Sequence, residues 1–238
     1  MSLKKQRFVI IGGSSGMGFA LAKKVVQAGA EVVLCGRSSS KLEAAVAELG
    51  SAASYQAFDA SVAQDVTKAF IAIGAYDHLV VTAADLTFAP LDTLTTEDIQ
   101  RMLSSKFWGP VNAAKHGLKF INRKGSVTFF SGLAAYRPAP GTTIVAALNA
   151  ALEGFAMALA LEVKPVRVNV ISPGVVDTPT WSFLSEQDRA GLFEQVSSGL
   201  PGGRVGHADD LADAVLSVVS NEFINATVLH VDGGGRIV

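Results

Sequence analysis

Short apolar runs rich in β-branched residues alternate with helical patterns along almost the whole chain. Strands are expected over residues 8–11, 31–35, 55–58, 78–82, 126–130, 167–171 and 227–231, and helices over about 17–28, 40–49, 63–73, 96–101, 105–121, 143–162 and 208–220. Strands that are apolar throughout are covered on both faces, as in a parallel sheet flanked by helices. The alternation therefore predicts an α/β fold, with residues 1–238 forming a single domain around a doubly wound parallel sheet of about seven strands.

Composition supports a large core and excludes several partners. The chain is 49% hydrophobic and 17% charged, and its net charge of -1 comes without a basic block, so we expect neither nucleic-acid nor membrane binding. The single cysteine, Cys35, fits a reducing cytoplasm, and the four histidines show no metal-site spacing. The longest apolar window, residues 143–161, contains Asn149 and Glu153, so in place of a membrane span we expect a helix buried against the protein or a partner subunit.

A glycine cluster follows the first strand and directly precedes a helix. In such a loop, glycine at position 12 permits a tight turn, at 16 a close approach of a pyrophosphate, and at 18 close helix–strand packing. The helix N-terminus adds free N–H groups and a partial positive charge. An ordinary strand-to-helix turn is the alternative, but the position inside a βαβ unit favours dinucleotide binding. The expected contacts are Gly12, Ser14, Ser15, Gly16, Met17 and Gly18.

The end of the second strand bears on the choice of cofactor. An acidic residue there would bind the ribose hydroxyls of NAD, but this chain has Gly36 followed by Arg37 and Ser38. The planar guanidinium of Arg37 can pair with a 2′-phosphate, although a solvated arginine is the alternative. NADP(H) is therefore favoured over NAD(H).

Residues 7–235 resemble the short-chain dehydrogenase/reductase family. The resemblance rests on IGGSSGMG, on Asp59-Ala60, on VNVISPGVVDT at 168–178, and on RVGHADDLADAVLSVVS followed by VLHVDGG. It implies a Rossmann-type fold and a homotetramer or homodimer built on the helices at 105–121 and 143–162. It also implies further cofactor contacts at Asp59, Ala60, Ala83, Ala84, Asn149, Pro173, Gly174, Val176 and Thr178.

The family's catalytic residues are absent. Its members use a Tyr-x-x-x-Lys pair, a preceding Ser and an Asn one helix earlier; the corresponding positions here hold Val145, Asn149, Gly132 and Lys106. None of the three tyrosines is followed four residues later by lysine. General acid catalysis contributes roughly 10²–10⁴-fold, so a reductase would need another proton donor.

Three residues are candidate substitutes: Ser131, which can orient a carbonyl, Tyr136, which can turn inward as a proton donor, and Lys106, which can supply positive charge. Their alternative roles are a cap, a packing aromatic and a solvated lysine. Two functions follow. One is an NADP(H)-dependent oxidoreductase of a small carbonyl or alcohol with a non-standard proton relay. The other is a catalytically silent NADP(H)-binding sensor or scaffold. Apolar residues between 181 and 200 suggest a lid over the substrate site.

Overall fold

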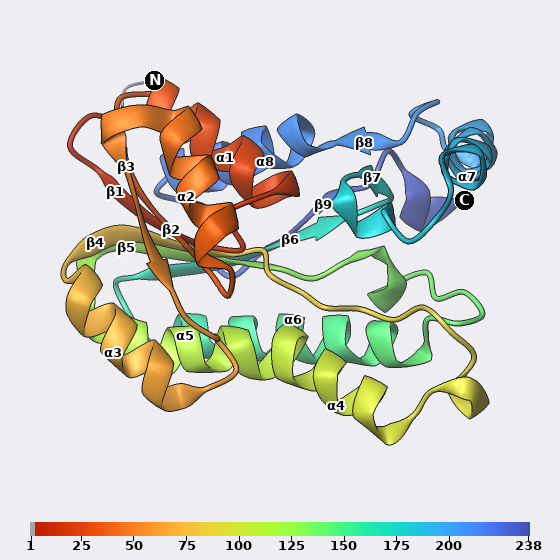
Figure 1. Ribbon diagram of the computed structural model, residues 1–238, viewed down its shortest axis with the longest axis horizontal. Coiled ribbons are helices and arrows are strands. Elements are labelled where there is room, and N and C mark those ends of the chain that lie inside the picture. Colours follow the sequence, from red (N-terminus) through yellow and green to blue (C-terminus); the bar gives the residue numbers. More distant parts are fainter. Residues whose placement is uncertain (1–2) are drawn as a thin grey trace.

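The computed structural model describes residues 3–238 and contains a seven-stranded parallel sheet (Figure 1). The strand order is β3-β2-β1-β4-β5-β6-β9, which confirms the predicted sheet and its strand count. The sheet strands are β1 Arg7–Ile11, β2 Glu31–Gly36, β3 Ala53–Ala57, β4 Tyr76–Val81, β5 Ile121–Phe130, β6 Arg167–Pro173 and β9 Val228–Val231.

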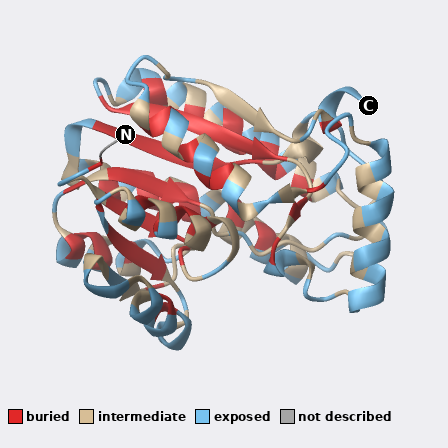
Figure 2. Ribbon diagram, turned by 90° about the horizontal axis from the view of Figure 1, so that it is seen from above, coloured by how far each residue is buried: buried red, intermediate tan, exposed pale blue. Residues whose placement is uncertain are grey.

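Helices cover both faces of the sheet, as the apolar strands require. One face carries α1 (Gly16–Gln27), α2 (Ser39–Leu49) and α8 (Ala208–Ser220), and the other carries α3 (Ala63–Ile73), α5 (Gly109–Gly117) and α6 (Thr143–Glu162) (Figure 1). Helix α4 (Thr96–Leu103) lies beside α6 on this second face. Figure 2 shows that the buried residues concentrate in the strands and in the inner sides of the helices.

The strand order reverses at β1, which pairs with β2 on one side and β4 on the other. Loops leaving the carboxyl ends of these strands diverge to opposite faces of the sheet, and the crevice between them is where open α/β sheets bind ligands. The glycine cluster lies at the end of β1, so the fold places it in this crevice.

The expected helix over 105–121 is wrong in detail. A π-helical turn, Ser104–Trp108, separates α4 from α5, and the N–H of Gly109 donates to the carbonyl of Ser104. Pro110 has no N–H to continue the regular ladder, which accounts for the interruption. Strand β5 begins at Ile121, where the helix was expected to end.

Three elements near the carboxyl edge were not predicted. Strands β7 (Val176–Asp177) and β8 (Gly206–His207) form a separate two-stranded sheet, and helix α7 (Glu186–Gly199) lies between them in sequence. The short strands carry too few residues for a recognisable alternation, and α7 has no buried residue to create a periodic apolar face.

Helix α6 is, among the described residues, the helix long and apolar enough to cross a membrane by length and composition. Its position argues for a core helix, because α6 packs against β6 and forms one layer of the α/β unit. One side of α6 is buried against the protein, as expected, and the opposite side is exposed.

Candidate cofactor site and a buried polar cluster

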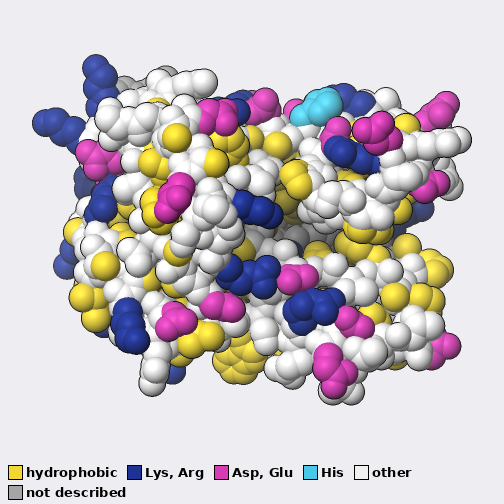
Figure 3. Space-filling view, viewed as in Figure 1, with side chains coloured by type: hydrophobic (Ala, Val, Ile, Leu, Met, Phe, Trp, Pro, Cys, Tyr) yellow, Lys and Arg dark blue, Asp and Glu magenta, His cyan; other side chains and the backbone are white. Residues whose placement is uncertain are grey.

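A cavity of about 420 Å³ opens at the carboxyl ends of β1, β2 and β4. Figure 3 shows this face hollowed across its middle, with basic and acidic side chains beside one another along the rim. The cavity brings together twelve of the predicted cofactor contacts, namely Gly12, Ser14, Ser15, Gly16, Met17, Arg37, Ser38, Asp59, Ala60, Ala83, Ala84 and Thr178. Sequence separation between these residues is large, so their convergence is a consequence of the fold.

The glycine loop is packed so closely that a side chain at Gly12 or Gly18 would clash with its neighbours. Gly12 has φ +91°, and a Cβ there would lie 2.5 Å from Thr82 Oγ1. A Cβ on Gly18 would lie 2.3 Å from the carbonyl oxygen of Gly12. Helix α1 begins at Gly16, and its first turn contains no acidic residue. The free N–H groups of this turn therefore face the cavity with no side-chain carboxylate on the turn to compete for a phosphate.

The second strand leads into a second helix N-terminus at the cavity. Ser38 is the N-cap of α2, and its side chain accepts a hydrogen bond from the N–H of Lys41. Lys41 and Arg37 both line the cavity, and the Arg37 side chain is 68% exposed. Two cations and a capped helix N-terminus together form a suitable receptor for a phosphate dianion.

The wall formed after β3 is fixed by local hydrogen bonds. Asp59 Oδ1 accepts bonds from both the N–H and the hydroxyl of Ser61, at 2.9 and 2.7 Å. Asn112, from α5, donates through Nδ2 to the carbonyls of Ala60 and Ser61. This part of the wall is therefore organised by contacts within the protein itself.

Five predicted contacts do not line the cavity: Gly18, Asn149, Pro173, Gly174 and Val176. Gly18 supports the glycine loop from behind, and Gly174 packs against Asp232, where a Cβ would lie 2.8 Å from the Asp232 Cα. The Val176 carbonyl accepts a hydrogen bond from Trp181 Nε1. Of the segment 173–178, only Thr178 reaches the cavity wall, next to Gly16.

The position of the family's tyrosine is filled by apolar packing. Val145 is 3% exposed and forms a small cluster with Met102 and Leu148. No group on Val145 can donate a proton to this part of the molecule.

Lys106 is buried, which contradicts its alternative role as a solvated lysine. It lies on the π-helical turn and is 5% exposed, and its Nζ donates to the carbonyls of Phe130 and Ser131, each at 2.9 Å. Burial lowers the pKa of Lys106 to about 8, while the nearby charge of Glu153 acts in the opposite direction. An ammonium group has three protons, and these two carbonyls use two of them.

Tyr136 is half-exposed, and its hydroxyl group is directed at a carboxylate. Its hydroxyl donates to Glu153 Oε2 at 2.5 Å, and its ring meets the His230 ring edge-on at 4.5 Å between centroids. Burial and the hydrogen bond to Glu153 raise the pKa of Tyr136 to about 12. Tyr136 therefore holds its proton at neutral pH, which is the opposite of an activated tyrosine.

The three candidate substitutes meet in one cluster through Glu153, which the sequence reasoning missed. Glu153 lies one turn after Asn149 on the same face of α6 and is 9% exposed. The signal was present, because these are two polar residues four apart in a mostly apolar helix, and such spacing places both on the same face. We call Lys106, Ser131, Tyr136, Asn149 and Glu153 the polar cluster.

Buried polar atoms without partners concentrate around this cluster. Along β5, Val127 and Phe129 face the core under α6, so Ser131 points to the same side. Along β6, Val168 and Val170 place Ser172 on that side too. Of seven such atoms among the described residues, five lie here: Ser131 Oγ, Asn149 Oδ1, Glu153 Oε1, Ser172 Oγ and His230 Nδ1. Groups of this kind are normally satisfied by bound water or ligand.

The predicted lid is aromatic, and it meets the loop after β4. Trp181 stacks on Phe88 with a centroid distance of 5.8 Å, and its ring also contacts Phe183 and Phe193. Within residues 3–238 no group of three or more histidine, cysteine or acidic side chains is arranged to hold a metal ion.

Known proteins are similar to this chain over almost its whole length. Residues 12–235 match the family model described as enoyl-(acyl carrier protein) reductase. The short-chain dehydrogenase/reductase malC of Malbranchea aurantiaca is 31% identical over 98% of this chain and 95% of its own. The 3-oxoacyl-[acyl-carrier-protein] reductase FabG of Chlamydia muridarum is 31% identical over 95% of each. A crystal structure of a small-chain dehydrogenase in complex with NADPH aligns with a TM-score of 0.86 and 32% identity, over 99% of this chain and 100% of that one.

Proposed function

The chain belongs to the short-chain dehydrogenase/reductase family, and we propose that it is an NADP(H)-dependent oxidoreductase that acts on a small carbonyl or alcohol through a non-standard proton relay. The observation that carries the proposal is the cavity at the strand ends, which joins the glycine loop, two helix N-termini and Arg37. Similar proteins are named as reductases, and one similar structure is described as a complex with NADPH.

The residues fit a phosphorylated dinucleotide. Gly12 and Gly18 form a cradle that a Cβ would fill, and the first turn of α1 supplies N–H donors for the pyrophosphate. Arg37, Ser38 and Lys41 would hold the 2′-phosphate, and Asp59 and Ala60 the adenine side. When bound there, the nicotinamide cofactor supplies the hydride for the carbonyl carbon.

The carbonyl oxygen needs one proton, and Lys106 is the best source in the polar cluster. A general acid works best with a pKa near the working pH, and burial brings the pKa of Lys106 to about 8. Tyr136 keeps its proton and is therefore not the proton source. Because Tyr136 is 47% exposed and Glu153 is buried, we assign Tyr136 the role of connecting the polar cluster with solvent. A bound water between Glu153 Oε1 and the third proton of Lys106 would complete a path for returning the proton.

The exposed side of α6 supports the homo-oligomer. Ala147, Ala151, Gly154 and Ala158 recur along it at helical spacing, with Leu161 69% exposed at its end. Small side chains allow close approach of a second helix, so a homodimer or homotetramer would bury this stripe. A cytoplasmic location is consistent with Cys35, which is buried as a free thiol.

The test combines cofactor binding with turnover. Purified protein is titrated with NADPH and NADH by fluorescence, and NADPH oxidation is followed across a panel of ketones, aldehydes and 3-oxoacyl thioesters. We expect NADPH to bind more tightly, and Arg37→Ala to lower NADPH affinity at least about tenfold while leaving NADH affinity unchanged. Tight NADPH binding without turnover on any substrate would favour the silent sensor.

Variants of Lys106 locate the proton source. Lys106→Met should lower kcat by roughly 10²-fold or more without changing the Kd for NADPH. Lys106→Arg keeps a positive charge but has no proton to give at neutral pH, so it should not restore kcat. Thermal unfolding of each variant checks the fold, and a restored kcat in Lys106→Arg would reduce the role of Lys106 to electrostatics.

A further inference from the structure

We propose that Asp85 is a specificity-determining residue: its carboxylate pairs with Arg37 in the cofactor-free protein, competes with the 2′-phosphate for that guanidinium, and so limits the preference for NADP(H). The inference rests on the proposed function, because it concerns the site for the phosphorylated cofactor. It assigns a role to Asp85, which lines the cavity but belongs neither to the glycine loop nor to the motif at the end of the second strand.

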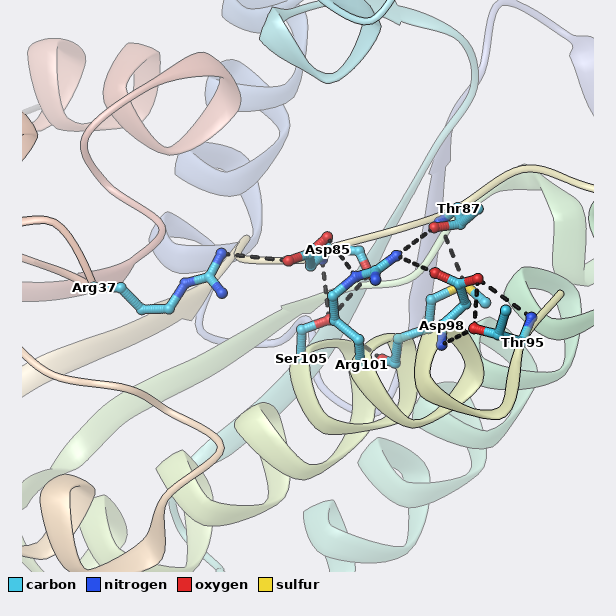
Figure 4. A network of polar contacts seen from close by, with 8 residues as sticks. Arg37, Asp85, Thr87, Thr95, Asp98, Arg101 and Ser105 are labelled. Carbon is cyan, nitrogen blue, oxygen red and sulfur yellow. Dashed lines mark hydrogen bonds and ion pairs between the residues drawn. The ribbon is translucent and has the colours of Figure 1, made fainter.

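The pairing joins two separate walls of the cavity. Arg37 follows β2 and Asp85 lies four residues after the end of β4, and both line the cavity (Figure 4). Arg37 NH2 approaches Asp85 Oδ2 at 3.4 Å. Within residues 3–238, Asp85 is the acidic side chain that pairs with Arg37. The group best suited to receive a 2′-phosphate therefore already has a negative partner.

The two partners are held very differently. Asp85 accepts from Arg101 Nε at 3.3 Å through Oδ1, and its N–H donates to Ser105 Oγ at 3.0 Å. Arg101 is itself fixed by Asp98 at 2.9 Å and by Thr87 at 2.6 Å, as Figure 4 shows. The Arg37 side chain is 68% exposed, and among the described residues Asp85 alone pairs with it. When a phosphate enters, Arg37 is the side chain that turns, and Asp85 stays in place.

The energies favour exchange of partners. A single exposed ion pair is weak, whereas arginine binds phosphate with two parallel charge-assisted bonds. The phosphate therefore wins Arg37, but the fixed carboxylate remains on the cavity wall and repels it. NADH has no 2′-phosphate, so neither competition nor repulsion applies to it. Removing the charge of Asp85 should strengthen binding of the phosphorylated cofactor alone.

The experiment compares dissociation constants for NADPH and NADH at low salt. Asp85→Asn is nearly isosteric and keeps an acceptor for Arg101. We expect it to tighten NADPH binding about two- to fivefold and to leave NADH binding unchanged, as the strength of one exposed charge pair suggests. Adenosine 2′,5′-bisphosphate against AMP gives the same comparison without the nicotinamide. The difference between Asp85→Asn and the wild type in NADPH binding should become smaller in high salt, because salt screens exposed charges.

Two controls separate this effect from a general change in charge. Asp92→Asn removes a carboxylate from the same loop between β4 and α4. Asp92 is exposed and does not line the cavity, so NADPH binding should not change. In the Arg37→Ala background, Asp85→Asn should lose the part of its effect that comes from competition for the guanidinium and keep the part that comes from repulsion of the phosphate.

The outcomes are distinguishable. If the wild type binds NADPH but Asp85→Asn leaves both cofactors unchanged, or tightens both equally, the role of Asp85 is overturned and the proposed function stands. Weaker NADH binding in Asp85→Asn would also overturn it, since Asp85 would then be a ribose ligand. If the wild type binds neither cofactor, the proposed function and this inference fail together.

Discussion

The hydroxyl group of Tyr136 donates a hydrogen bond to Glu153 Oε2 across 2.5 Å, linking the surface to the buried polar cluster. Burial, the hydrogen bond to the carboxylate and its charge raise the pKa of Tyr136 to about 12. In Glu153→Gln the acceptor is neutral, so tyrosinate is less disfavoured and the pKa should fall part of the way toward 10. The remaining rise is due to burial. An absorbance titration of tyrosinate measures the change.

A matched pair on the surface provides the control for this titration. Tyr55 donates to Glu43 Oε1 at 2.6 Å and its pKa is raised by that bond, but the pair is exposed and far from α6. Glu43→Gln should therefore shift only the Tyr55 transition, and Glu153→Gln only that of Tyr136. Single Tyr→Phe variants assign the two transitions. A Tyr136 transition that ignores Glu153→Gln would disprove the contact in solution.

Stability against pH reports on the buried ammonium of Lys106. Burial lowers the pKa of Lys106 to about 8 from 10.5, so between these values the unfolded chain binds more protons than the folded protein. This group therefore makes the free energy of unfolding rise as pH rises from 8 to 10.5. Below pH 8 both states hold the proton, and the cost of burying the charge is complete.

The variant Lys106→Met removes that contribution. The difference in unfolding free energy, wild type minus Lys106→Met, should therefore increase by about 3 kcal/mol across the window. Cys35 and Tyr76 have raised pKa values and weaken the folded state at high pH, but they are present in both proteins and cancel in the difference. Urea unfolding at a series of pH values measures it, and a flat difference would show that Lys106 is solvated.

The close packing of the glycine loop can be tested by adding a single methyl group. In Gly18→Ala the new Cβ would lie 2.3 Å from the carbonyl oxygen of Gly12, and backbone cannot turn aside as a side chain can. Overpacking of this kind costs about 1–3 kcal/mol, and the displaced loop should lose NADPH affinity as well. Urea unfolding and NADPH titration of the same samples measure both losses.

Gly191→Ala is the control for that substitution. Gly191 lies inside α7, and a Cβ there meets no atom within 4 Å. Alanine in a helix interior is favoured over glycine by about 0.8–1.0 kcal/mol, so this variant should be more stable than the wild type. Equal behaviour of the two variants would mean that the loop does not have the tight packing described for Gly12 and Gly18.

The sheet was predictable because its signal is local and repeated. Most of the sheet strands contain a short apolar run, and helices recur between them, so the strand count follows without knowledge of long-range contacts. Two helices were expected here, but the π-helical turn Ser104–Trp108 between them was not predicted, because a proline such as Pro110 near a helix start is also compatible with a regular helix. Strands of two residues, as in β7 and β8, have no periodicity to detect.

The cofactor loop was predictable from spacing, whereas the polar cluster needed the fold. Lys106, Tyr136 and Glu153 lie on three different segments, and only the packing of α6 against the π-helical turn and against residues 133–135 brings them together. Sequence reasoning assigned Lys106 to solvent as the alternative because lysine is rarely buried without partners; here its partners are main-chain carbonyls, which leave no trace in the sequence. The role of Asp85 depends likewise on a contact between distant segments.

The exposed stripe on α6 offers a last prediction. Ala151 and Ala158 lie on it, with Gly154 between them, where a Cβ meets no atom within 4 Å of the same chain. If a second copy packs there, Ala151→Glu places a charge in a close apolar interface and should shift the protein to a smaller species in light scattering after size exclusion. Ala44→Glu adds the same charge to an exposed position on α2 and should leave the oligomer intact. A wild-type monomer, or two variants of equal size, would exclude α6 as the interface.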